Sequence, residues 1–189
     1  MLEGRRETLY PGYAYTSASV NTAAGKSFQY GYFEMSAQLP KGQGMWPAFW
    51  MLGTNIGEVD WPFCGEIDIM EMVGGAEDNK IYGTAHWNEG AIGHRYTGGN
   101  STLAGGVFND AFHRFGVLWT PEVLAWYLDG NEYYRLDITD ARFDAFRKPM
   151  YVLLNLAIGG DWPGSPDEKT QFPARYAIDY VRVYAAQQD

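Results

Sequence analysis

The sequence has almost no cysteine. Cys64 is the only one among 189 residues. A single thiol cannot form an intrachain disulfide, and a zinc site built from several cysteines is excluded as well. The hydrophobic core must therefore supply the stability, and a chain of this length can bury a sizeable core as one domain over residues 1–189.

Positive charge is also scarce. The chain has 14 Lys and Arg residues against 23 Asp and Glu, which gives a formal net charge of −9. Binding to a phosphate backbone needs basic side chains that replace its counterions. We therefore expect no nucleic-acid partner, and sulphated or uronic polysaccharides are disfavoured for the same reason. The partner should be neutral or basic.

Long apolar runs are missing too. The most apolar stretch, 45–52 (MWPAFWML), is much shorter than a membrane span requires. The beginning of the chain, MLEGRRETLYPGY, lacks the apolar core of a signal peptide. We therefore expect no membrane partner, and no signal peptide is recognisable in this chain.

The sequence shows no long window with a helical period, but it is rich in strand signals. Apolar and polar residues alternate over 33–39 and 81–87, which is typical of half-buried strands, and turns rich in Gly, Pro and Asp separate such segments. Asp129-Gly130 predicts a tight hairpin. Many short strands of this kind indicate an all-β antiparallel sandwich. Further strands are predicted at 45–52 (buried on both faces), 112–120, 123–128, 133–136, 150–158 and 177–184, with one short helix at 140–146 and with Trp87, Trp119 and Trp126 as core or outer-face residues.

The segment 64–72 reads CGEIDIMEM, and its third acid arrives one residue late. Glu66 and Asp68 follow the period of a strand, whereas Glu71 would point to the other face. One extra residue taken up as a β-bulge near Ile69-Met70 restores a common face. Glu66 and Glu71 would then be roughly 13 Å apart at Cα. Their side chains could bring the carboxyls to about 5 Å, the separation used in retaining glycoside hydrolysis.

Three clustered acids cannot all ionise cheaply, so repulsion and burial should raise the pKa of one of them. This chemistry predicts a charged nucleophile, a protonated acid/base, and Asp68 between them to orient or tune the nucleophile. From these residues alone, a solvated acidic strand face or a divalent cation site remains as an alternative.

The segment Glu66–Glu71 resembles the catalytic signature of glycoside hydrolase family 16, in the bulged E-x-D-x-x-E form of its laminarinase-like members. Matching motifs follow the family order from about Tyr15 to Tyr184. They are 45–52 (MWPAFWML), 61–62 (WP), 86–87 (HW), 119–121 (WTP), 126–127 (WY), 154–164 (LNLAIGGDWPG) and 179–184 (DYVRVY).

This resemblance implies a jelly-roll of two curved antiparallel sheets with an open cleft on the concave face. It assigns Glu66 as nucleophile, Asp68 as its helper and Glu71 as acid/base, and it places His86 within reach of them. The implied enzyme is secreted, needs no cofactor for catalysis and cleaves internal β-1,3 bonds of a neutral β-glucan such as laminarin. Alternatives are mixed-linkage β-1,3-1,4-glucan, a galactan, transglycosylation, or a non-catalytic glucan-binding module.

Several further side chains are candidates for substrate binding. Indole rings stack on sugar faces, and an indole N–H can bond a hydroxyl, although tryptophan is also a normal core residue. Two polar strand residues could bond hydroxyls or could equally satisfy a backbone group. The candidates are Trp46, Trp50, Trp61, Trp162, Asn155 and Glu34, with Trp61 and Trp162 favoured because both lie in Pro-flanked loops.

The sequence also departs from the family pattern. Arginines usual in relatives are replaced at Ser19, Tyr32 and Ser36, and only fourteen residues precede Tyr15, where laminarinase-like domains have a longer segment. From this we expect an exposed sheet edge and either a rearranged monomer or a homodimer formed through it. A structural calcium ion near Asp179 is possible, with its site incomplete.

Overall fold

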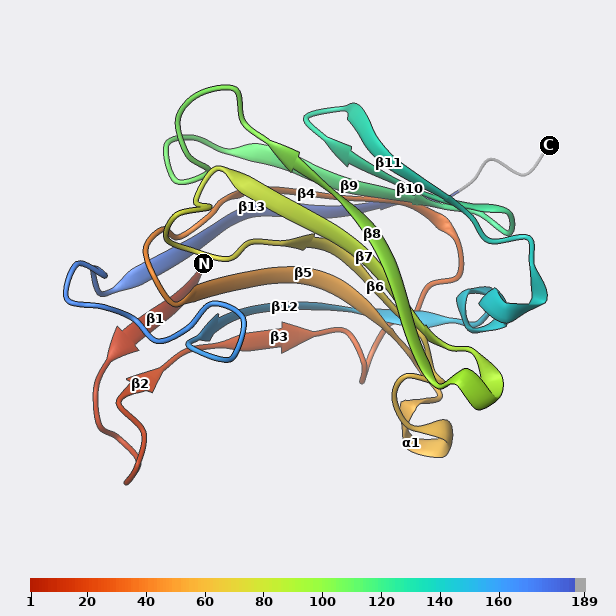
Figure 1. Ribbon diagram of the computed structural model, residues 1–189, viewed down its shortest axis with the longest axis horizontal. Helices are drawn as coiled ribbons and strands as arrows, with labels where there is room; N and C mark the ends of the chain where they lie inside the picture. The colour runs from red at the N-terminus through yellow and green to blue at the C-terminus, as the bar shows by residue number, and fades with distance from the viewer. Residues whose placement is uncertain (186–189) are drawn as a thin grey trace.

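The computed structural model describes residues 1–185. It contains two antiparallel β-sheets that lie face to face and curve together (Figure 1). The prediction of an all-β jelly-roll sandwich is confirmed. Within the described residues, no helix has the length and apolar character needed to cross a membrane.

The six-stranded sheet carries the acidic segment. Every neighbouring pair in it is antiparallel. Its spatial order is β3 (Ser19–Asn21), β12 (Met150–Ile158), β5 (Met45–Gly53), β6 (Glu66–Glu71), β7 (Lys80–Asn88) and β8 (His94–Thr102).

The seven-stranded sheet covers the other side of the core. It too is antiparallel throughout, and the N-terminal strand β1 lies inside it, between β13 and β2. Its order is β11 (Asn131–Asp137), β10 (Val123–Leu128), β9 (His113–Trp119), β4 (Gly31–Gln38), β13 (Ala174–Tyr184), β1 (Leu2–Arg6) and β2 (Tyr15–Thr16).

The core fills the space between the sheets. Alternate residues of each strand point into it, as the pleat requires. Trp119 and Trp126 are fully buried and Trp87 is 5% exposed, so their prediction as core residues is confirmed. Among residues 1–185, one continuous buried cluster of thirty residues includes Ile67, Ile69 and Met70 from the acidic strand.

The short connections agree with the turn signals. Asp129 and Gly130 both have positive φ, 51° and 84°, as a type I′ hairpin turn requires. The predicted helix is present as a 3₁₀ segment, Ala141–Arg147, whose N-cap Asp140 accepts a hydrogen bond from the Arg142 amide. A four-residue helix, α1 (Ile56–Val59), and a 3₁₀ turn, Gly90–Ile92, complete the helices of the described residues.

Two predictions of burial were wrong. The strand over 45–52 is not covered on both faces, because Trp46 and Trp50 are only half-buried and face an open cleft. The strand over 33–39 is not half-exposed, because its polar residues Glu34 and Ser36 are each only 8% exposed. Neighbouring side chains of β13, including Tyr180, cover this outer face.

Candidate active site

A β-bulge lies in β6 where the sequence predicted one. Against β7, Asp68 pairs with Thr84 and Glu71 pairs with Tyr82, so two residues of β6 oppose one of β7. Against β5, the register also shifts, between Phe49 and Trp50. The extra residue therefore lies between Asp68 and Glu71, and the prediction of a bulge near Ile69-Met70 is confirmed.

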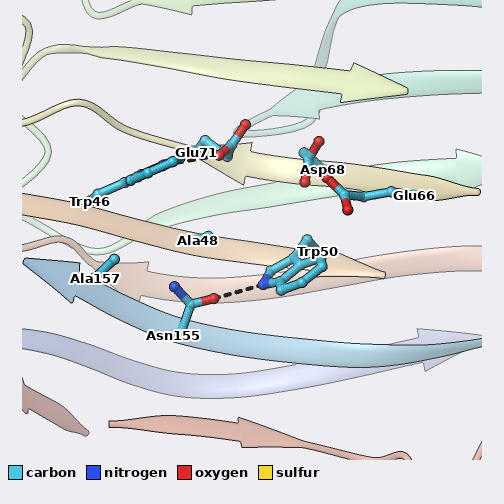
Figure 2. Close-up of a pocket in the computed structure, with 8 residues that line it drawn as sticks. All are labelled: Trp46, Ala48, Trp50, Glu66, Asp68, Glu71, Asn155 and Ala157. Carbon is cyan, nitrogen blue, oxygen red and sulfur yellow. Dashed lines mark hydrogen bonds between the residues drawn. The ribbon is translucent and has the colours of Figure 1, made fainter. Parts of the chain in front are cut away.

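The bulge brings all three acids to one cleft. Glu66, Asp68 and Glu71 line it together, while Ile67, Ile69 and Met70 are fully buried on the core side. Figure 2 shows Asp68 between the two glutamates, with strands β5 and β12 forming the rest of the floor. The other lining residues are Trp46, Ala48, Trp50, Asn155 and Ala157.

Each glutamate accepts a hydrogen bond from one indole N–H. Trp61 Nε1 donates to Glu66 Oε2 at 3.0 Å, and Trp46 Nε1 donates to Glu71 Oε1 at 2.9 Å. Hydrogen bonds to an ionised carboxylate are stronger than neutral ones. The two tryptophans therefore fix the directions of the carboxylates and stabilise negative charge on each.

His86 lies beside the acids, as predicted. Its Nε2 atom is 3.1 Å from Asp68 Oδ2 and 3.9 Å from Glu66 Oε1. Asp68 is 4% exposed, and its Oδ2 atom has no aligned hydrogen-bond donor among residues 1–185. The imidazole is therefore in ion-pair range of two carboxyls and can compensate charge on either.

Burial dominates the electrostatics of this cluster. It raises the pKa of Glu66 to about 8, with a further increase from the neighbouring Asp68. Burial and the charge of Glu71 raise the pKa of Asp68 as well. Burial also raises the pKa of Glu71, which its hydrogen bond from Trp46 opposes, and lowers the pKa of His86. Burial therefore favours protonated carboxyls in this cleft at higher pH than for exposed acids, and general acid catalysis requires such a protonated group.

A second histidine, His94, belongs to the site and was missed in the sequence. The two imidazoles are joined by a hydrogen bond of 3.0 Å between His86 Nδ1 and His94 Nε2. Trp61 packs on His94, with ring centroids 4.4 Å apart. The hairpin from β7 to β8 brings His86 and His94 together. Its strand β8 was not predicted because it is polar, rich in glycine and largely exposed.

The remaining aromatic candidates also lie at the cleft. Trp50 Nε1 donates to Asn155 Oδ1 at 2.7 Å, so this amide oxygen is occupied while the residue still lines the floor. Trp162 is 45% exposed and packs edge-on against Trp46, with centroids 5.7 Å apart. Tyr82, which was not predicted as a binding residue, also packs on Trp162, with ring centroids 5.0 Å apart.

Glu34 was wrongly placed among the cleft residues. It lies on β4, which belongs to the opposite sheet, and its carboxylate accepts a hydrogen bond of 2.7 Å from Tyr180 Oη. The alternation of β4 was read correctly, but its polar face is the outer face of the sandwich. Tyr32 and Ser36 point from the same strand to the same face, so their departure from the family pattern does not alter the cleft.

Asp179 lies on β13, in the sheet opposite the cleft. It is exposed at a register shift of β13, between Ile178 and Tyr180. In the part of the chain that the structure describes, one group of three His, Cys, Asp or Glu side chains has ligand atoms within 4.8 Å of one another, and it consists of Glu66, Asp68 and His86. Calcium is also bound by backbone carbonyl oxygens, so the calcium site near Asp179 stays a prediction.

Comparisons with known proteins agree with this geometry. Among solved structures, the laminarinase catalytic domain from Thermotoga maritima is similar to this chain at a TM-score of 0.89 and 42% identity, covering 99% of this chain and 77% of that one. The beta-glucanase of Rhodothermus marinus is 39% identical over 195 residues, which cover 97% of this chain and 67% of the relative. The clotting factor G alpha subunit of Tachypleus tridentatus is 38% identical over 188 residues, or 97% of this chain.

The chain spans only 27% of the length of the clotting factor subunit. The family assignment rests on a broader match. Residues 5–182 match the model described as glycosyl hydrolases family 16, which is nearly the whole chain. This chain belongs to glycosyl hydrolase family 16.

Proposed function

We propose that this chain is the catalytic domain of a retaining, endo-acting glycoside hydrolase that cleaves internal β-1,3-glucosidic bonds of a neutral β-glucan such as laminarin. The observation that carries the proposal is the bulge in β6, which places Glu66 and Glu71 in one cleft with an indole N–H on each. Binding alone would need neither acid, so their presence argues against a non-catalytic glucan-binding module.

The first step needs one charged and one protonated glutamate, so Glu66, whose pKa is raised to about 8 by burial, must give up its proton before it attacks. The Glu66 carboxylate attacks the anomeric carbon while Glu71 gives its proton to the glycosidic oxygen, which leaves with the bonding electron pair. The product is a glycosyl ester on Glu66. Asp68 and His86, next to Glu66, would balance its charge as it changes from carboxylate to ester.

The second step reverses these roles. Glu71, now ionised, takes a proton from water as the water oxygen attacks the anomeric carbon and the Glu66 carboxylate departs. Two inversions leave the β-configuration unchanged. The cleft is open and carries exposed tryptophans, and besides His86 and His94 the described site residues are acidic or neutral. A neutral polysaccharide therefore fits it best.

Hydrolysis assays on defined glycans test the proposal. The protein is incubated with laminarin, lichenan, agarose and carrageenan, and reducing ends and anomeric configuration are followed. We expect β-anomers released first from laminarin as internal bonds break. An α-anomer as first product would exclude retention, and faster cleavage of lichenan or agarose would move the substrate to mixed-linkage glucan or galactan.

The roles of the two glutamates are tested separately. Glu66→Ala should abolish turnover on every substrate while glucan binding remains. Glu71→Ala should abolish hydrolysis of laminarin. For aryl glycosides whose leaving group needs no proton, kcat/KM should stay close to wild type, while kcat falls because the second step lacks its base. If Glu71→Ala reduces kcat/KM equally for both substrate types, its assignment as the acid is wrong.

Action outside the cell and assembly are part of the proposal. Extracellular action is supported by the polymeric substrate class. Pairing of two chains through the N-terminal strand region is supported by the place of β2 at the edge of its sheet. Sedimentation of the 189-residue chain tests the pairing: a single monomeric species at micromolar concentration would exclude it.

A further inference from the structure

The bulge that aims Glu71 interrupts the strand ladder at a buried place. Asp68 and Glu71 pair with Thr84 and Tyr82, so Ile69 and Met70 both face Gly83. A bulge leaves ladder groups without their regular partners, and buried backbone groups without partners are costly. A bulge of this kind needs support from outside its own sheet.

That support comes from the opposite sheet. Trp126, on β10, is fully buried, and its Nε1 atom donates a hydrogen bond of 2.8 Å to the carbonyl oxygen of Asp68. The bond crosses the core and ends on the residue directly before Ile69 and Met70, the two residues that oppose Gly83. It therefore holds the backbone between the two catalytic glutamates.

Gly83 leaves the space that the indole needs. A Cβ atom at this position would lie 2.3 Å from Trp126 Cδ1 and 2.7 Å from Trp126 Nε1, far inside contact distance. Gly83 is also the residue of β7 that faces the bulge. The glycine and the tryptophan thus form one arrangement, in which a missing side chain on β7 admits a donor from β10.

We propose that Trp126 is a positioning residue, which holds the bulge of β6 in the form that directs Glu71 toward Glu66 through its hydrogen bond to the Asp68 carbonyl. The inference rests on the proposed function for its catalytic consequence. Glu66 precedes the bulge and stays paired with Leu52 and His86. Glu71 follows it, so loss of the bond should displace the acid rather than the nucleophile.

The chain offers a matched control for the test. Trp119 is also fully buried and also donates its indole N–H to a backbone carbonyl at 2.8 Å, that of Phe146. Trp126→Phe and Trp119→Phe therefore remove the same kind of bond from the same core. We expect similar losses of melting temperature. Only Trp126→Phe should lower kcat on laminarin, by about tenfold or more, with KM little changed.

The substrate dependence of that loss identifies the residue affected. If Glu71 is displaced, Trp126→Phe should keep kcat/KM close to the wild-type value for aryl glycosides with good leaving groups, because their first step needs no proton from Glu71. Gly83→Ala, whose Cβ would press on the indole and also on Tyr133 Oη, should give the same pattern. Equal losses of kcat for the Trp126 and Trp119 variants, or equal losses on both substrate types, would overturn the inference.

Amide hydrogen exchange provides a readout that needs no activity. In Trp126→Phe the amides of 69–71 should exchange faster than in wild type, while Trp119→Phe leaves them unchanged. Unchanged exchange in Trp126→Phe would overturn the inference even if activity fell. If the wild-type protein cleaves no glycan, the proposed function fails, whereas the exchange experiment still decides whether Trp126 holds the bulge.

Discussion

Trp46 Nε1 lies 2.9 Å from Glu71 Oε1 and donates a hydrogen bond to it. This bond favours the ionised carboxylate and lowers the pKa of Glu71, whereas burial raises it and is the stronger influence. A general acid works only while it holds its proton. The contact with Trp46 therefore helps to set the pH at which the proposed acid is lost.

Removing this donor should move the alkaline limb of the activity profile. In Trp46→Phe the pKa of Glu71 should rise, because burial then acts without opposition, and activity should persist to higher pH than in wild type. The measurement is kcat/KM on laminarin as a function of pH. The quantity compared is the pH at which kcat/KM falls on the alkaline side, and not its maximal value. Trp50→Phe is the control, since its indole donates to Asn155 and not to an acid. A limb at unchanged pH in Trp46→Phe would contradict the assignment of Glu71.

Glu66 should destabilise the fold as pH rises. The folded protein keeps this proton up to about pH 8, whereas the usual value for the residue is 4.5. Between these values the folded state binds more protons than the unfolded state, so the free energy of unfolding falls with increasing pH. In Glu66→Gln this decrease in the free energy of unfolding with pH should be absent. We expect equal stability near pH 4.5 and an advantage for the variant toward pH 8, on the order of a few kcal/mol in urea unfolding.

A surface glutamate supplies the control for this measurement. The pKa of Glu132 is lowered by its hydrogen bonds from Arg135, so its wild-type carboxylate stabilises the protein at higher pH and loses that effect as pH falls. Glu132→Gln should therefore show the opposite trend to Glu66→Gln. A Glu66→Gln advantage that stays constant with pH would show that the effect is not electrostatic.

His94 should affect the rate through His86. The hydrogen bond of 3.0 Å between the two imidazoles fixes which nitrogen of His86 faces Asp68. His94→Phe retains a ring beside Trp61 but removes the bond, and we expect a decrease in kcat of about two- to tenfold. His94→Gln keeps a donor and should recover part of the rate. If both variants match wild type, His94 has no positioning role.

Chelation should leave catalysis unchanged. The proposed mechanism uses two glutamates and water, and no step needs a Lewis acid. Dialysis against EDTA should therefore not alter kcat on laminarin. Melting curves before and after dialysis test the predicted structural ion at Asp179: a melting temperature lowered by dialysis and restored by calcium is the result expected for a bound ion. A loss of kcat restored by calcium would contradict the proposed mechanism.

The acidic segment was the most predictable part of the site. Glu71 comes one residue later than the strand period requires, so only an inserted residue brings it to the same face as Glu66 and Asp68. The position of the bulge then follows from strand geometry. The type I′ turn at Asp129-Gly130 was equally predictable. Such a turn needs positive φ at two consecutive residues, and Asp-Gly is one of the few pairs that adopt this conformation readily. These features depend on local backbone geometry, which short sequence patterns encode directly.

Other features depend on which strands meet in space. The alternation of β4 gives two faces but does not say which sheet contains the strand, so Glu34 was assigned to the wrong side of the sandwich. His94 was missed because its strand is too polar and glycine-rich for a strand signal. The bond from Trp126 to the Asp68 carbonyl joins residues 58 positions apart, and the local sequence around neither residue indicates this contact.

Two small apolar side chains, Ala48 and Ala157, lie in the floor of the cleft beside the tryptophans. Ala48 is the cross-strand partner of Glu71, and Ala157 is the partner of Trp46, whose indole donates to Glu71. A larger side chain at either position would raise the floor under a bound polymer and would also press on the acid or on its donor. Substrate fit and bond cleavage in this domain thus depend on the same two small positions, so a change of selectivity there should also change the rate.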